Sequence, residues 1–270
     1  MELKETKLTP LLVANWKMQL TVAESRQRLS ELQKSLPAKQ KNIEIVICPS
    51  FMALPSLAAS LSGTPIRLGA QDVAWDERGA YTGEVSPLDL VDLGLGHVII
   101  GHSERRHLLG ETETMVARKM ISAYSHGLMP ILCVGESADD RAAARHEDVV
   151  RHQLETALRS VPPPGRGRHM AIAYEPVWAI GTGQPADPAL AAAMGATIRQ
   201  ILINQYGPVQ AERSFRLLYG GSVDDTNITK YVHSEGFQGA LVGSASLNPS
   251  IFAKMITNVA RSTSQKSKST

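Results

Sequence analysis

Residues 11–16 read Leu-Leu-Val-Ala-Asn-Trp, a short apolar run that ends in polar residues, and Lys17 follows it directly. Nearly continuous apolar runs of this length are typical of parallel strands that are buried on both faces. An open sheet that binds a dinucleotide usually has a glycine-rich turn, GxGxxG, after its first strand. No such turn follows Asn15, and its absence favours a closed barrel over an open sheet.

The same kind of run recurs along the chain, and longer amphipathic segments separate the runs. The predicted strands are Leu11–Trp16, Ile43–Pro49, Ile66–Asp72, His97–His102, Met129–Glu136, Met170–Glu175, Phe215–Gly221 and Gly239–Ser244. The predicted helices are Thr21–Leu36, Phe51–Leu61, Glu111–His126, Asp139–Ser160, Asp187–Tyr206 and Pro249–Arg261. Because eight right-handed βα units close into a barrel, the sequence predicts an α/β fold, a single (β/α)8 barrel.

The domain organisation follows from length and composition. The chain has 270 residues, of which 43% are hydrophobic, and barrels of roughly 250 residues are common single domains. No linker rich in proline or serine divides it, so we expect one domain over residues 1–261. Residues 262–270 are polar and basic and show no periodicity, and we expect them to form a disordered tail.

The charge and the cysteines argue against several classes of protein. The 28 basic and 26 acidic residues nearly balance, which points to neither nucleic acid nor an anionic membrane as a partner. No segment reaches the roughly 18 apolar residues needed to span a bilayer. Cys48 and Cys133 form no disulfide framework and no zinc pattern, which suits a reducing compartment. We therefore expect a cytoplasmic protein.

Reactive residues gather where the predicted strands end. Asn15 and Lys17 belong to the end of the first strand, His102 to the fourth and Glu175 to the sixth. In a (β/α)8 barrel the carboxyl ends of the strands meet at the face that carries the active site. These residues would supply that face with a base, an electrophile and a positive charge.

Each of these residues also has an ordinary structural interpretation. A glutamate at a strand end is usually solvated or ion-paired, and a single histidine is usually satisfied within a core. Glu175, however, ends an apolar run and precedes Pro176-Val177-Trp178, so we expect a partly dry setting in which a carboxylate is a stronger base. His97 is expected on the opposite side of its strand from His102, and no ligand spacing such as HExxH occurs. The sequence therefore indicates no metal site.

Glycine-rich turns follow the last two predicted strands. They are Gly220-Gly221-Ser222 and Gly243-Ser244, and many barrels bind phosphate at these turns through backbone N–H groups. The segment Pro176–Ala186 begins with proline and tryptophan near a strand end and contains Gly181-Thr182-Gly183. This composition fits a loop that closes over the site as a lid.

Six motifs together resemble the signatures of the triosephosphate isomerase family. They are Asn15-Trp16-Lys17-Met18, Ala80–Glu84 (AYTGE), Gly101–Arg106 (GHSERR), Ala173–Gly183 (AYEPVWAIGTG), Tyr219–Ser222 (YGGS) and Leu241-Val242-Gly243. They stand in the family's order and at its approximate spacing, and the resemblance extends from about Leu11 to Ala260.

The resemblance implies a glycolytic and gluconeogenic enzyme that interconverts dihydroxyacetone phosphate and D-glyceraldehyde 3-phosphate without a cofactor or metal. Glu175 would move a proton between adjacent carbons, and neutral His102 would polarise the carbonyl and shuttle protons between the oxygens; the family is the standard example of this acid–base pairing. Lys17 would stabilise the developing negative charge, and Asn15 would orient the substrate.

Further roles are carried over from the resemblance in the same way. Gly181, Ser222, Gly243 and Ser244 would hold the phosphate group of the sugar through main-chain N–H groups, and Ser103 and Glu104 would support the site. The chain would form a homodimer in which Thr82 reaches the Asn15–Lys17 region of the other subunit.

Three positions depart from the family pattern, and two other functions stay open. Gln19 stands where an asparagine is usual, Ser244 replaces the second glycine of a Gly-Gly pair, and Pro185 lies in the second hinge of the lid. A Cβ at position 244 would crowd the phosphate if the backbone there required a positive φ. The alternatives are an isomerase of a four-carbon ketose phosphate and a non-catalytic barrel with a binding role.

Overall fold

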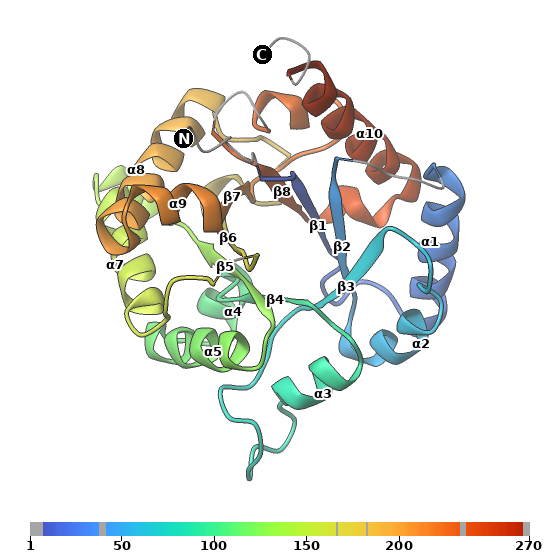
Figure 1. Cartoon of the computed structure of the whole chain (residues 1–270). Coiled ribbons are helices and arrows are strands. Elements are labelled where there is room, and N and C mark those ends of the chain that lie inside the picture. The colour runs from blue at the N-terminus through green and yellow to red at the C-terminus, as the bar shows by residue number, and fades with distance from the viewer. Residues whose placement is uncertain (1–7, 38–41, 166, 182, 233–235, 267–270) are drawn as a thin grey trace, which may run out of the picture.

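The computed structural model describes residues 8–37, 42–165, 167–181, 183–232 and 236–266, except the side chains of 263–266. Eight parallel strands form a closed barrel in sequence order, and β8 pairs with β1 (Figure 1). The strands are β1 (Leu11–Asn15), β2 (Glu44–Cys48), β3 (Ile66–Ala70), β4 (His97–Ile100), β5 (Met129–Val134), β6 (Met170–Tyr174), β7 (Phe215–Tyr219) and β8 (Gly239–Val242). The predicted (β/α)8 fold and all eight predicted strands are confirmed.

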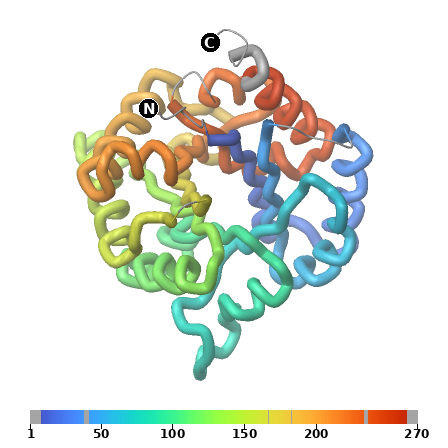
Figure 2. The backbone as a smooth tube through the Cα atoms, in the orientation of Figure 1, coloured from blue at the N-terminus to red at the C-terminus, as the bar shows by residue number. Residues whose placement is uncertain are grey.

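Helices surround the barrel, and the chain runs once around it, so that the last helix packs beside the first (Figure 2). The helices are α1 (Val22–Ser35), α2 (Leu54–Ala58), α3 (Pro87–Asp92), α4 (Ser103–Leu108), α5 (Glu113–Ser125), α6 (Ala138–Ala142), α7 (His146–Leu158), α8 (Pro188–Tyr206), α9 (Pro208–Ser214) and α10 (Pro249–Lys266). No helix in the described part of the chain is both long and apolar enough to cross a membrane.

The helices differ from the sequence prediction in three respects. The predicted helix 139–160 is two helices, α6 and α7, because the chain turns at Ala144, whose φ is 56°. The short helices α3, α4 and α9 were not predicted, since one or two turns are too short to show a hydrophobic period. Helix α10 continues to Lys266, past the predicted end at Arg261, and no glycine or proline interrupts this part of the sequence. Of the predicted tail 262–270, residues 267–270 lie outside the described residues.

Two apolar layers hold the barrel together. The larger layer fills the space between strands and helices, and a smaller one lies inside the barrel and includes Val13, Ile99 and Leu218. The inner space is narrow at Gly69, where an added Cβ would lie 2.7 Å from Sγ of Cys48 and 3.0 Å from Cγ1 of Val46. A larger residue at position 69 would therefore displace side chains of the neighbouring strand β2.

Charged residues occupy the amino-terminal end of the barrel interior. The carboxylate of Glu44 on β2 lies 2.8 Å from Arg216 on β7 and 3.3 Å from Nε2 of His97 on β4. Strands β2, β4 and β7 are not neighbours, so these side chains meet inside the barrel. We expected His97 to lie on the opposite side of its strand from His102, and this expectation is wrong. His97 points into the barrel at its amino-terminal end, whereas His102 lies at the carboxyl-terminal end. Strand alternation does not relate the two residues, because β4 ends at Ile100.

This cluster makes stability depend on pH. Burial alone would raise the pKa of Glu44, but the close approach of His97 and the charges of Arg216, His97 and Arg67 outweigh it and lower the pKa to about 2. A carboxyl group whose pKa is lower in the folded state stabilises the fold above its unfolded pKa, here 4.5, and the stabilisation disappears as the pH falls from 4.5 towards 2. This shift in the pKa of Glu44 corresponds to a contribution of about 3 kcal/mol to the free energy of unfolding.

We therefore expect Glu44→Gln to lose less stability on acidification than the wild type. Urea unfolding at equal protein concentration should show that the wild type loses about 2 kcal/mol more than the variant between pH 5 and pH 2.5. All other carboxyl groups are common to both proteins, so the difference isolates Glu44. Equal losses in the two proteins would contradict the assignment.

Candidate active site

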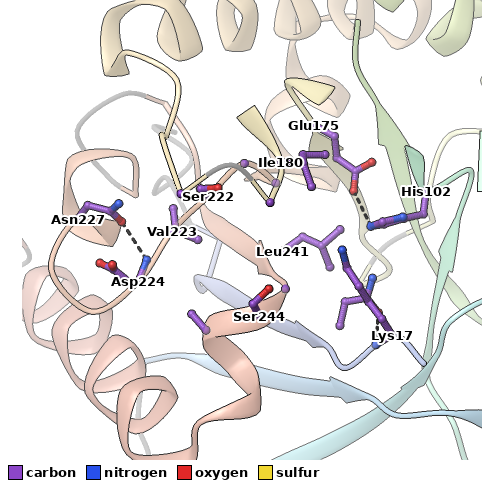
Figure 3. Close-up of a pocket in the computed structure, with 17 residues that line it drawn as sticks. Lys17, His102, Glu175, Ile180, Ser222, Val223, Asp224, Asn227, Leu241 and Ser244 are labelled. Atoms are coloured by element: carbon purple, nitrogen blue, oxygen red, sulfur yellow. Dashed lines mark hydrogen bonds and ion pairs between the residues drawn. The ribbon is translucent and has the colours of Figure 1, made fainter. Parts of the chain in front are cut away.

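A cavity of about 340 Å³ opens at the carboxyl ends of the strands (Figure 3). It is lined by Asn15, Lys17, His102, Glu175, Ile180, Gly181, Gly183, Gly220, Gly221, Ser222, Val223, Asp224, Asn227, Leu241, Gly243, Ser244 and Ala245. The eight residues to which the resemblance assigned catalytic or phosphate-binding roles thus share one cavity, and Ser103 and Glu104 contact its members. Thr82 is exposed and does not line this cavity.

Glu175 is the buried carboxylate of the site, with 2% of its surface exposed. It follows β6, and its own N–H donates to the carbonyl oxygen of Val134 at 2.8 Å. Its Oε2 accepts a hydrogen bond from the backbone N–H of Ser103 at 2.9 Å, and its Oε1 lies 3.2 Å from Nε2 of His102. The residue fits tightly, because a Cβ at Gly220 would lie 2.8 Å from Cγ of Glu175.

His102 is oriented by the helix that begins beside it. It is the N-cap of α4, and its Nδ1 accepts a hydrogen bond from the backbone N–H of Glu104 at 3.2 Å. An imidazole nitrogen that accepts a backbone N–H carries no proton, so the proton of the neutral ring is on Nε2. Nε2 faces Glu175 and the cavity (Figure 3), where it can donate a hydrogen bond to an oxygen atom.

Lys17 is held in a strained backbone conformation at the other side of the cavity. Its φ is 50°, in the left-handed region that non-glycine residues seldom adopt. Side-chain contacts fix the turn, since its N–H donates to Oδ1 of Asn15 at 3.0 Å and Nε2 of Gln71 donates to its carbonyl oxygen at 2.8 Å. Nζ lies 2.5 Å from Oε1 of Glu104. Strain of this kind concentrates at functional sites.

The turn after β8 lies next to Lys17. An ideal Cβ at Gly243 would lie 3.6 Å from Cε of Lys17. Ser244 begins a short 3-10 helix, Ser244–Leu247, and is not among the described residues with positive φ. The condition under which its Cβ would crowd a phosphate therefore does not apply. The other two departures lie outside the cavity lining, and Gln19 and Pro185 are both exposed.

We expect Ser244→Gly to change little. Because the backbone at position 244 suits any residue, removal of the side chain should alter KM for a phosphorylated substrate by less than about threefold, with a small loss of stability from the added flexibility of glycine. Steady-state kinetics and a thermal melt check this result. A large gain in affinity would show that the hydroxymethyl group does crowd the ligand.

The start of the segment 176–186 is tied to a buried carboxylate that the sequence did not reveal. Oε1 of Glu136, which is fully buried, accepts hydrogen bonds from Nε1 of Trp178 at 2.8 Å and from the hydroxyl of Tyr174 at 3.1 Å. The guanidinium of Arg141 lies 3.2 Å from the same oxygen and 5.0 Å from the centroid of the Trp178 ring. Burial, with a smaller contribution from Glu136, raises the pKa of Tyr174, so its hydroxyl stays protonated and donates.

Other lining residues were also missed. Ile180, Val223 and Leu241 give the cavity apolar walls, while Asp224 and Asn227 hydrogen-bond to each other at its edge through N–H of Asp224 and Oδ1 of Asn227, 3.0 Å apart (Figure 3). Their positions were a signal, because Ile180 precedes Gly181, Val223, Asp224 and Asn227 follow the glycine turn after β7, and Leu241 lies in β8 before Gly243. Thr182, at the tip of the predicted lid, lies outside the described residues.

Comparison with known proteins agrees with this arrangement. The sequence model of the family described as "Triosephosphate isomerase" matches residues 10–259. Among curated proteins, the triosephosphate isomerase of Symbiobacterium thermophilum is 46% identical over 247 residues, which cover 91% of this chain and 94% of that protein. Those of Chloroflexus aurantiacus and Roseiflexus castenholzii are each 45% identical, with 92% of this chain covered and 98% and 96% of theirs.

Proposed function

The chain belongs to the triosephosphate isomerase family, and on that premise we propose how its own residues interconvert dihydroxyacetone phosphate and D-glyceraldehyde 3-phosphate. The enzyme is an isomerase of glycolysis, and the substrate is a phosphorylated triose. The observation that carries the proposed site is the meeting of Glu175, His102 and Lys17 around one cavity. A carboxylate, a neutral imidazole and an ammonium group are the groups that proton transfer next to a carbonyl requires.

Glu175 acts as the base. Its carboxylate removes a proton from the hydroxymethyl carbon of dihydroxyacetone phosphate, and the electrons of the C–H bond form the enediolate. The resulting carboxylic acid returns a proton to the neighbouring carbon and yields the aldehyde. The hydrogen bond from the N–H of Ser103 positions the carboxylate before the substrate binds. When this hydrogen bond breaks, the carboxylate would be free to reach the substrate.

His102 and Lys17 stabilise the charge on the substrate oxygens. The Nε2–H of His102 polarises the carbonyl and moves protons between the two oxygens, and the bond from Glu104 N–H to Nδ1 keeps the ring in that tautomer. Lys17 places a positive charge opposite the enediolate, and Asn15 fixes the lysine turn through Oδ1. Prearranged charges of this kind stabilise a transition state without reorganisation.

The phosphate group is assigned to the glycine-rich turns that line the cavity. Gly181, Ser222, Gly243 and Ser244 come from three segments that line it, and their main-chain N–H groups would donate to the phosphate oxygens. The loop 176–186 would close over the bound sugar and exclude water, which protects an enediolate from losing its phosphate. Ser103 and Glu104 support the site through Glu175, Lys17 and His102.

We further propose a homodimer, in which a second copy covers four exposed apolar side chains. Met18 follows β1, Tyr81 lies in the loop between β3 and α3, Leu108 ends α4 and Leu109 follows it; they are 93%, 39%, 77% and 66% exposed. Contact with a second copy would remove these apolar side chains from water.

The loop between β3 and α3, which carries Thr82, projects away from the barrel (Figure 1), and its root is fixed. Asp72 lies 2.7 Å from Nζ of the buried Lys119 and 2.9 Å from Arg105. A rigid projection can insert Thr82 into the Asn15–Lys17 region of a partner. A solution mass of twice the 29.2 kDa of one chain supports the dimer, and a monomer at all concentrations would refute it. The cytoplasm is the compartment that fits a glycolytic enzyme with two free buried cysteines.

Isomerisation in D2O tests the proposed chemistry. A base that exchanges its proton with solvent should leave deuterium on the carbon adjacent to the new carbonyl, and NMR of the product detects it. A product that carries no deuterium would contradict a base that exchanges its proton with solvent during the reaction. The four-carbon alternative keeps the same chemistry, so a second sugar must be tested beside the triose. The non-catalytic alternative predicts no turnover.

A further inference from the structure

Two tyrosines hold the last residue of the loop 176–186. The N–H of Ala186 donates to the hydroxyl oxygen of Tyr219 at 3.1 Å, and the hydroxyl of Tyr231 donates to the carbonyl oxygen of Ala186 at 2.6 Å. Tyr219 ends β7, and Tyr231 follows the 3-10 helix Ile228–Lys230. Ala186 is 1% exposed, so both of its backbone polar groups depend on these partners for hydrogen bonds.

The two rings form one packed unit. Their centroids lie 4.0 Å apart and their planes differ by 4°, and Phe237 meets the Tyr219 ring edge-on at 5.9 Å. Tyr219 and Tyr231 are 0% and 1% exposed. Burial raises the pKa of both hydroxyls, so both are protonated at neutral pH and Tyr231 can donate its hydrogen bond to Ala186.

This unit also supports the turn assigned to the phosphate. An added Cβ at Gly221 would lie 2.3 Å from the hydroxyl oxygen of Tyr219, so the tyrosine lies directly against that turn. The hydroxyl of Ser222 donates to the carbonyl oxygen of Ala179 at 2.8 Å. Through these contacts the segment 220–222 is connected to the loop at Ala179 and again at Ala186.

We propose that Tyr231 is a positioning residue that fixes Ala186 at the end of the loop 176–186. Ile180 and Gly181 of the same loop line the cavity, so a fixed loop end helps to retain a phosphorylated ligand. Its hydroxyl holds the carbonyl of Ala186, and its ring keeps Tyr219 against Ala186 and Gly221. Tyr231 does not line the cavity, so it acts on the ligand only through the loop and Tyr219. The inference rests on the proposed phosphate site.

Tyr231→Phe tests the inference, because it removes the hydroxyl and keeps the stacked ring. The probe is 2-phosphoglycolate, a two-carbon phosphate whose carboxylate stands for the enediolate. We expect its Kd to rise about 3–10-fold, the effect of one hydrogen bond lost from the bound conformation, mainly through faster dissociation. KM for glyceraldehyde 3-phosphate should rise by a similar factor, while kcat does not fall.

Tyr206→Phe is the matched control. The hydroxyl of Tyr206 also contacts backbone carbonyl oxygens, those of Val161 at 3.0 Å and Leu158 at 3.2 Å, but at the end of α8 and outside the cavity lining. Both variants should lower Tm by a similar few degrees, and only Tyr231→Phe should weaken binding of the probe.

The outcomes separate this inference from the proposed function. A Kd within twofold of wild type for Tyr231→Phe, or an equal rise in Tyr206→Phe, would assign Tyr231 a structural role alone and overturn the inference. Tighter binding by Tyr231→Phe would overturn it as well. A wild-type protein that fails to bind 2-phosphoglycolate would instead overturn the proposed phosphate site, and the inference with it.

Discussion

Glu175→Asp should lower kcat about 10²–10³-fold and leave KM within about threefold of wild type. The shorter side chain withdraws the carboxylate by one methylene group, and a displacement of about 1 Å from the productive geometry can reduce a rate 100-fold. The phosphate contacts assigned to Gly181, Ser222, Gly243 and Ser244 do not involve Glu175, so substrate binding should change little. A loss in kcat without a matching change in KM is the behaviour of a group that acts in the transition state.

Steady-state kinetics in both directions measures this effect, with Glu147→Asp as a control for the same chemical change. Glu147 is exposed on α7 and lies outside the cavity, so its variant should behave as wild type. A kcat within tenfold of wild type for Glu175→Asp would remove Glu175 from the role of base. An increase in KM that accounts for the whole loss would instead assign it to binding.

Lys17→Met should lower kcat/KM by about 10²–10³-fold, because methionine keeps most of the side-chain volume and removes the charge. Loss of one prearranged group that faces a developing negative charge typically has an effect of this size. The fold should tolerate the change. The Lys17–Glu104 pair is 23% and 43% exposed, and ion pairs at that exposure contribute little to stability.

Lys254→Met provides the matched control for the loss of a lysine charge. Lys254 forms an ion pair with Asp225 at 3.5 Å, is 65% exposed and lies outside the cavity lining. Kinetics should show wild-type activity for this variant, and thermal melts should show that both lysine variants are folded. Wild-type kcat/KM in Lys17→Met would contradict the role assigned to the ammonium group.

The strands could be predicted from the sequence because a strand that is buried on both faces consists almost entirely of apolar residues. A run such as Ile43–Pro49 contains few polar residues, and the reactive residues stand out at the ends of such runs. The carboxyl ends of parallel strands meet at one face of a barrel, so strand order alone predicted that Asn15, His102 and Glu175 share a site. The apolar runs and the barrel architecture were therefore sufficient to predict where the site lies.

Other features depend on contacts between distant segments and left no local signal. The inward direction of His97 depends on where β4 ends, and its partner Glu44 lies on another strand. In the sequence Glu136 is the polar residue at the end of a predicted strand. Only the fold shows that Trp178 and Tyr174 donate hydrogen bonds to it. Ala186 and Tyr231 are 45 residues apart in sequence, so no motif connects them.

The residue roles are proposed from the geometry of the cavity, and the choice of substrate follows from family membership. Glu175, His102 and Lys17 could act on any small 2-hydroxy carbonyl compound that fits the cavity. The turns proposed to bind phosphate favour a phosphorylated sugar in the cavity, whose volume is about 340 Å³. Substrate length is therefore the most informative variable to change.

Turnover of glyceraldehyde 3-phosphate and of an erythrulose phosphate, measured side by side on one preparation, tests the account most directly. We predict that the triose is converted with a kcat/KM near the upper range for enzymes, about 10⁷–10⁸ M⁻¹s⁻¹, and that the four-carbon sugar is converted far more slowly. Faster conversion of the four-carbon sugar, or no triose turnover above the level of Glu175→Asp, would contradict the account.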